Sequence, residues 1–89
     1  ANPDMMENMI EEGDFVILGN RYESQLCAIE MEAGCLIICE GAKVSSTITK
    51  IAAQHNCVII STAYDTYTVA RLINQAIHVR FFLKRLYVE

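Results

Sequence analysis

The stretch CVIISTAYDTYTVA (residues 57–70) joins an apolar run to a polar turn and then to the start of an amphipathic segment. This order predicts a buried strand, a turn and a capped helix. Asp65 stands where an N-cap side chain accepts hydrogen bonds from backbone N–H groups. Val69, Leu72 and Ile73 then give the apolar stripe of a helix that packs on the sheet.

Two earlier apolar runs, residues 15–18 and 35–39, are also followed by turn residues and a helical pattern. Continuous apolar runs separated by helices are typical of parallel strands that are buried on both faces. We expect helices at residues 3–12, 23–33 and 45–55 and from residue 65 onward, with Gly34 and Asn56 as left-handed stop residues. The predicted fold is a three-layer, Rossmann-like α/β domain with a short parallel sheet, helices on both faces and an N-terminal helix first.

This predicted domain spans residues 1–78. In the tail, residues 79–89, apolar Val79, Phe81 and Leu83 alternate with other residues, which is consistent with an edge strand or with an extended lead-in to a following domain.

Composition favours a protein partner. The 89-residue chain is 53% hydrophobic, which is more than a domain of this size easily buries by itself, so we expect a homodimer. The net charge of −4 argues against a nucleic-acid partner, and no apolar run is long enough to cross a membrane. The candidate side chains for the interface with a second copy or a neighbouring domain are Met5, Met6, Met9, Phe81 and Phe82.

The four cysteines form no C-x-x-C pair and lie mostly in or beside apolar runs. This pattern predicts buried, reduced thiols and a cytoplasmic protein. His55 and His78 fall in different elements, so no metal site is expected. No nucleotide-binding glycine motif, nucleophile elbow or other catalytic set is present, so we expect no catalytic residue in this chain.

In an open parallel sheet, ligands bind beyond the carboxyl ends of the strands, where helix N-termini favour anions. A small anion or a phosphate group is therefore a sensible ligand, although the same residues also serve to cap helices and fix turns. For Asp65, an N-cap role competes with a role as general base. The candidate ligand-binding residues are Arg21, Lys43, Ser61, Thr62, Tyr64, Asp65 and Thr66.

Three segments carry a resemblance to a known family: VILGNR (16–21), AGCLIICEG (33–41) and VIISTAYDTYTVA (58–70). Together they make the chain similar to DRTGG domains over roughly residues 3–77. The sequence departs from the family pattern at two places. Asn20 stands where an Asp is common before Arg21, and Cys39-Glu40-Gly41 stands where Thr-Gly-Gly is common.

The chain most resembles the DRTGG domain between the CBS domains of family II inorganic pyrophosphatases. That resemblance implies a parent enzyme that uses Mn or Co plus Mg in a separate catalytic domain and binds adenine nucleotides at its CBS domains. This chain would then be a non-catalytic regulatory and dimerisation module beside CBS domains. The alternative is a sensor that binds a small anion or a nucleotide phosphate at the strand ends.

Overall fold

The computed structural model describes residues 9–76 and 86–88. Strands and helices alternate along the chain, as the sequence predicts. The strands are β1 (Phe15–Leu18), β2 (Cys35–Ile38), β3 (Val58–Ser61) and β4 (Leu86–Val88). The helices are α2 (Tyr22–Glu30), α3 (Ser46–Gln54) and α4 (Thr66–Ala76).

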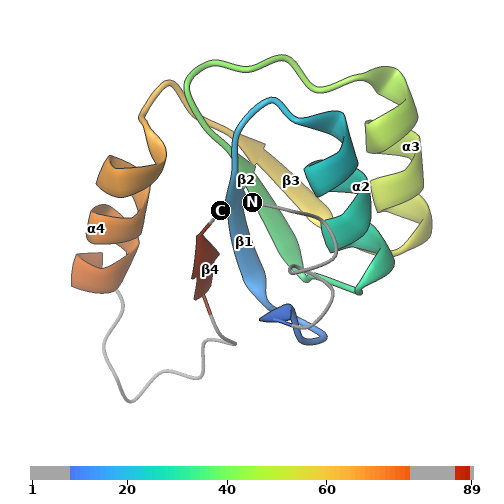
Figure 1. The fold of residues 1–89 in the computed structure, drawn as a ribbon, viewed down its shortest axis with the longest axis horizontal. Coiled ribbons are helices and arrows are strands. Elements are labelled where there is room, and N and C mark those ends of the chain that lie inside the picture. Colours follow the sequence, from blue (N-terminus) through green and yellow to red (C-terminus); the bar gives the residue numbers. More distant parts are fainter. Residues whose placement is uncertain (1–8, 77–85, 89) are drawn as a thin grey trace.

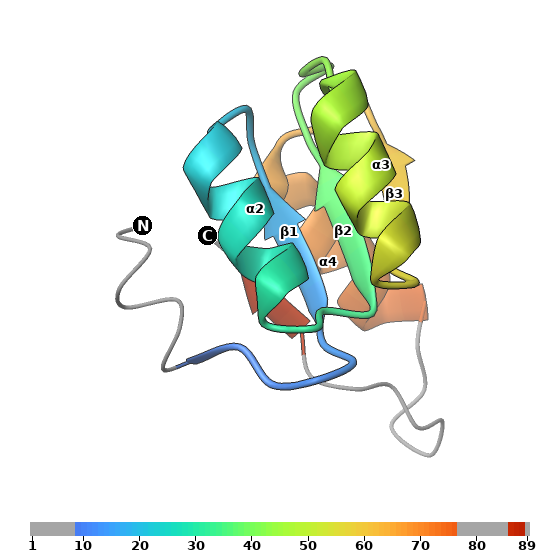
Figure 2. The ribbon, with the colours of Figure 1, turned by 90° about the vertical axis from the view of Figure 1, so that its right-hand side faces the viewer.

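The four strands form one parallel sheet in the order β3-β2-β1-β4. Helices α2 and α3 cover one face of this sheet and α4 lies on the other (Figure 1), and the perpendicular view shows the sheet between the two helical layers (Figure 2). The predicted α/β class, the parallel sheet and the helices on both faces are therefore confirmed. Residues 3–8 of the expected N-terminal helix lie outside the described residues; of its remaining residues, Met9 is helical and residues 10–12 are not.

The alternation of side chains along each strand divides the core into two layers. In β1, Val16 and Leu18 pack beneath α2 and α3, whereas Phe15 and Ile17 point toward α4. The layer beneath α2 and α3 is extensive, while the layer beneath α4 has few buried members. These members are Ile17, Cys35, Ile37, Cys39 and Val69.

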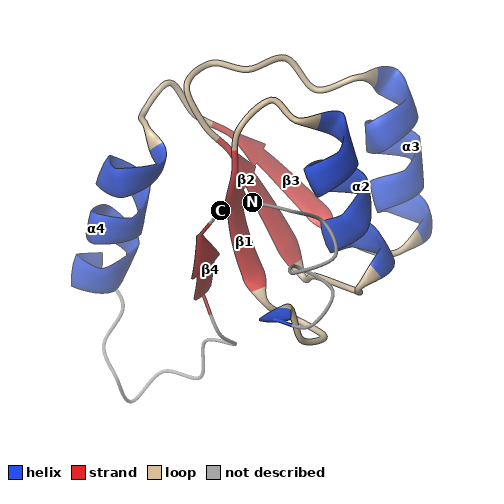
Figure 3. Cartoon of the chain, viewed as in Figure 1, coloured by secondary structure: helices blue, strands red, loops and turns tan. Residues whose placement is uncertain are grey.

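Local signals explain where the helices begin and end. The Ser45 hydroxyl accepts from the backbone N–H of Ile48 at 3.1 Å and caps α3. Asn56 has a φ of 57°, which confirms it as the left-handed stop after α3. The loops that follow β1, β2 and β3 all lie at one end of the sheet (Figure 3), as parallel strands require.

Three expectations from the sequence are wrong. Glu32, not Gly34, takes the left-handed position after α2, with a φ of 64°. Strand β3 is not buried on both faces, because it forms an edge of the sheet that α4 does not reach, and Val58 and Ile60 are exposed. Leu72 is also exposed, because the α4 side chains that pack on the sheet are Val69, Ala70 and Ile73.

Candidate functional site

The loop that follows β2 is held rigidly at the carboxyl end of the sheet. The backbone N–H of Cys39 donates to the carbonyl of Leu18 at 2.8 Å, which joins this loop to the end of β1. On its other side, Glu40 and Gly41 donate to the carbonyls of Tyr64 and Thr62 at 2.8 and 2.9 Å. These bonds require two successive left-handed residues, with φ values of 61° at Glu40 and 66° at Gly41.

The turn between β1 and α2 is fixed by a buried amide. The Nε2 group of Gln25 in α2 donates to the carbonyl of Gly19 at 2.9 Å, and its side chain is almost fully buried. Arg21 is the N-cap residue of α2, but its side chain makes no capping hydrogen bond to the first turn. Gln25 was not among the predicted site residues, because a glutamine within a helical pattern gives no sequence signal of a structural contact.

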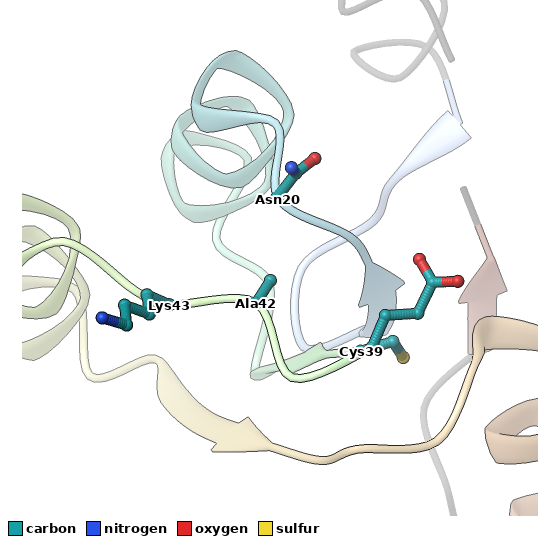
Figure 4. Close-up of a pocket in the computed structure, with 5 residues that line it drawn as sticks. Asn20, Cys39, Ala42 and Lys43 are labelled. Carbon is teal, nitrogen blue, oxygen red and sulfur yellow. The ribbon is translucent and has the colours of Figure 1, made fainter.

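A cavity of about 470 Å³ opens between these two loops, and we call it the strand-end cavity (Figure 4). It contains one basic side chain, Lys43, which extends away from Cys39 (Figure 4). A carboxylate, Glu40, also belongs to its wall, so the charges around it are mixed rather than uniformly positive. The lining residues are Asn20, Cys39, Glu40, Ala42 and Lys43.

In the turn between β3 and α4, polar side chains accept hydrogen bonds from the backbone and stabilise the start of the helix. Asp65 Oδ1 accepts from the backbone N–H of Thr68 at 2.7 Å, and Thr62 Oγ1 accepts from the backbone N–H of Tyr64 at 3.2 Å. The hydrogen bonds from the backbone and hydroxyl of Thr68, followed by the charge of Arg71, lower the pKa of Asp65 below its ordinary value. A lowered pKa makes the carboxylate a weaker base, which favours the N-cap role over the general-base role.

The structure does not gather the seven predicted ligand-binding residues into one place. Of these seven, the strand-end cavity is lined by Lys43 alone, beside Asn20, which was not one of the seven. Thr62 and Tyr64 instead line a different, apolar hollow described below. Ser61 is the last residue of β3 and Thr66 the first of α4.

The cysteine side chains are buried and are not placed to act as nucleophiles. All four side chains are buried and none forms a disulfide, as the sequence predicts. Burial raises the pKa of Cys35 and, together with smaller effects that include nearby charges, raises that of Cys57 to about 11. Burial, followed by the charges of Glu40 and Asp65, also raises the pKa of Cys39. These thiols are therefore protonated near neutral pH and are poor nucleophiles.

Within residues 9–76 and 86–88, no three His, Cys, Asp or Glu side chains are close enough together to hold a metal ion. No helix in the same part of the chain has the length and apolar character that crossing a membrane requires.

The second hollow lies between α4 and the β2–β3 side of the sheet, and we call it the α4 groove. It has a volume of about 340 Å³, and its walls are almost entirely apolar. It exists because α4 packs against β1 and leaves the outer part of this face uncovered. The lining residues are Phe15, Ile37, Ile60, Thr62, Tyr64, Val69, Leu72 and Ile73.

Of the predicted interface residues, Met5, Met6, Phe81 and Phe82 lie outside the described residues. Met9 is described, and about half of its side chain is exposed. The α4 groove was not predicted, because the continuous apolar run of β3 gives no sequence signal that this strand lies at the edge of the sheet.

Comparison with known proteins identifies the family. The family profile described as "DRTGG domain" matches residues 1–76. The chain therefore belongs to the DRTGG domain family.

Its relatives are much longer proteins. The chain is 34% identical over 80 residues to the cobalt-dependent inorganic pyrophosphatase of Clostridium perfringens, which covers 90% of the chain and 15% of the relative. It is 30% identical over 76 residues to a probable manganese-dependent inorganic pyrophosphatase of Thermotoga maritima, covering 85% of the chain and 14% of the relative. It is also 34% identical over 83 residues to the uncharacterized protein YtoI of Bacillus subtilis, covering 93% and 19%.

A solved structure has the same fold. It contains the CBS and DRTGG domains of the regulatory region of the Clostridium perfringens pyrophosphatase, in complex with the activator diadenosine tetraphosphate. The TM-score is 0.83 and the identity 32%, over 96% of this chain and 37% of that one. The chain thus corresponds to about a third of that regulatory region and to less than a fifth of each full-length relative.

Proposed function

We propose that this chain is a non-catalytic regulatory and dimerisation module of an inorganic pyrophosphatase that adenine nucleotides control. The observation that carries this proposal is the likeness of almost the whole chain to the regulatory region of a pyrophosphatase, with a TM-score of 0.83. The parent protein hydrolyses pyrophosphate in the cytoplasm in a separate domain that holds manganese or cobalt together with magnesium. Adenine nucleotides bind to CBS domains that flank the chain.

The packing of the chain suits a part that transmits movement. The start of β1 is anchored, because Ile10 is buried in the core and the buried carboxylate of Asp14 accepts from the backbone N–H of Glu11 at 2.8 Å. At the other end of the described chain, β4 pairs directly with β1. Both connections therefore converge on the same strand, and a displacement of one flanking domain reaches the other through β1.

A chimeric enzyme tests this role. The DRTGG domain of the Clostridium perfringens enzyme is replaced by this chain, and pyrophosphate hydrolysis is measured with and without diadenosine tetraphosphate. We expect both hydrolysis and its activation to be retained. A second chimera, with a flexible Gly/Ser linker in place of the domain, is expected to hydrolyse pyrophosphate without activation. If the two chimeras respond alike to the activator, the proposed regulatory role is wrong.

A second candidate function is a sensor for a small anion or a nucleotide phosphate. The specific observation in its favour is the strand-end cavity, which lies next to the start of α2 and includes Asn20 and Lys43. The first turn of α2 receives no side-chain cap from Arg21, and backbone N–H groups at a helix start attract anions.

Thermal unfolding with millimolar inorganic phosphate or AMP tests the sensor. A ligand of the native state raises the melting temperature, and Lys43→Ala is expected to abolish that rise. Lys50→Ala is the matched control, because Lys50 is also an exposed lysine but does not line the strand-end cavity. An unchanged melting temperature in the wild-type chain rejects this second candidate.

A further inference from the structure

The outer edge of β3 carries backbone groups that face away from the sheet. The backbone N–H groups of Val58 and Thr62 donate to the carbonyls of Gly34 and Ile38 at 3.1 and 2.9 Å, so both point toward β2. Because backbone groups alternate in direction along a strand, those of Ile59 and Ser61 point outward. Among the described residues, no strand pairs with this outer edge.

This edge lacks the features that protect exposed strands from pairing. Natural edge strands are usually blunted by lysine or another charge, by proline or by a bulge. Residues 56–64 contain no charged residue and no proline. Two apolar side chains stand beside the open edge, with Val58 57% and Ile60 48% exposed. An edge of this kind is therefore suited to being covered by another strand.

We propose that β3 pairs in an antiparallel direction with β3 of a second copy of this chain, so that two 4-stranded sheets become one continuous sheet. This inference rests on the proposed dimerisation and specifies the surface that it uses. An interface around a two-fold axis places the same residues of both copies together, so a charged edge would repel itself. The uncharged stretch at residues 56–64 avoids that repulsion.

The directions of the backbone groups restrict the register. A pairing centred on Ile60 brings the outward backbone groups of Ile59 opposite those of Ser61 of the partner subunit. The two Ile60 residues then form a non-hydrogen-bonded pair, for which the Cα–Cα separation is about 4.5 Å. The two-fold axis is perpendicular to the joined sheet. The α4 helices of both copies therefore lie on the same face of it.

The exposed apolar surface supplies about half of the area that a standard interface buries. The two α4 grooves adjoin one another in this arrangement and share one apolar trough above the joined sheets. The side chains that border it in each copy are Val58, Ile60, Tyr64 and Leu72, all of them exposed. Together they expose about 400 Å² per copy, which is roughly half of the ~800 Å² per partner of a standard interface. Backbone pairing along β3 adds to this area.

A matched pair of variants tests the edge by sedimentation equilibrium of the 89-residue chain. Val58→Lys puts a charge on the β3 edge, and Val88→Lys puts the same charge on β4 at the opposite edge, where Val88 is 42% exposed. We expect Val58→Lys to raise the dissociation constant of the dimer about 100-fold, because pairing then removes the charged side chain from water beside the apolar trough, opposite Thr62 of the partner subunit. Val88→Lys is expected to leave it within about threefold, as surface changes outside an interface do.

A cross-link provides the positive test and does not depend on weakening the fold. Ile60→Cys places two thiols at the two-fold axis, at a Cα separation that a disulfide accepts. Mild oxidation is expected to convert this variant to a covalent dimer, while Tyr67→Cys, on the exposed face of α4, stays uncross-linked.

The outcomes separate the two proposals. If the wild-type chain is a dimer but Val58→Lys keeps its affinity and Ile60→Cys does not cross-link, the edge pairing is wrong and dimerisation stands. If the wild-type chain is a monomer, both the edge pairing and the proposed dimerisation are wrong.

Discussion

Gly34→Ala is expected to destabilise the fold strongly, because the turn before β2 passes very close to the backbone that leads into β1. A methyl group at Gly34 would lie 2.9 Å from the carbonyl oxygen of Gly13 and 3.3 Å from its carbonyl carbon. Neither segment can easily retreat. The N–H of Gly13 donates to the carbonyl of Glu32, and the N–H of Gly34 donates to that of Asp14, each at 2.9 Å.

The expected loss follows from these contacts. Forcing a methyl group into a filled space costs about 1–3 kcal/mol. Stretching the two hydrogen bonds that hold the turn adds about 0.5–1.5 kcal/mol for each bond that is lost. We therefore expect Gly34→Ala to lower the free energy of unfolding by about 2–4 kcal/mol, a large part of the stability of a domain this small.

Gly19→Ala is the matched control. A methyl group there meets no atom within 4 Å, yet the substitution reduces the freedom of the unfolded chain in the same way. Urea unfolding followed by circular dichroism gives both free energies. Gly19→Ala is expected to change the free energy of unfolding by less than about 1 kcal/mol in either direction. If the two variants agree within about 0.5 kcal/mol, the close approach of the two turns does not exist.

Three further changes test the caps and the core. Ser45→Ala removes the cap of α3 and is expected to lower the free energy of urea unfolding by about 1 kcal/mol. The control Ser46→Ala, within the helix, is expected to lower it by less than half of that, and equal losses would contradict the capping role. Because the folded pKa of Asp65 is lowered, its stabilising effect is present above the ordinary pKa of about 3.9 and is lost as the pH falls through the folded value. The difference in free energy of unfolding between the wild type and Asp65→Ala should therefore decrease as the pH is lowered to about 2. A difference that is independent of pH would refute this. Ile38→Ala, at a fully buried site, is expected to cost about 2–5 kcal/mol, whereas Ile60→Ala at the exposed edge should cost far less when both are measured in the monomeric state.

The sequence was sufficient to predict the elements that local chemistry specifies. The apolar run Phe15–Leu18 forms β1 with the expected bounds, and Asp65 caps α4 as expected. The repetition of strand and helix predicted the parallel sheet, because parallel strands need a crossover of this length. The family resemblance of residues 58–70 agrees with the profile match.

Other features depend on contacts between distant segments. Gly34 was expected as a helix stop because glycine is common there. The structure instead requires glycine at that position for the approach of Gly13, and Glu32 takes the left-handed conformation. Likewise, the apolar run of β3 looks like that of a central strand. Nothing local shows that β3 stands at the edge of the sheet, or that α4 packs against β1 and leaves Val58 and Ile60 exposed.

The site was the least predictable part. Topology predicted that polar residues would meet beyond the strand ends, and Asn20 and Lys43 do line one cavity there. The hydroxyl groups after β3 are used differently. Thr62 bonds to its own turn and, together with Tyr64, lines the α4 groove. Sequence spacing places a residue at an edge of the sheet, but the direction of its side chain depends on the loop conformation.

The most direct test of the account is the mass of the 89-residue chain in solution, measured by light scattering across a concentration series that reaches tens of micromolar. The chain has a mass of 10.0 kDa. A dimerisation module is expected to show twice this mass at the upper concentrations and to dissociate, if at all, only on dilution. A mass of one chain throughout the series would contradict dimerisation and would leave the exposed β3 edge and the α4 groove to be covered by flanking domains of the parent protein.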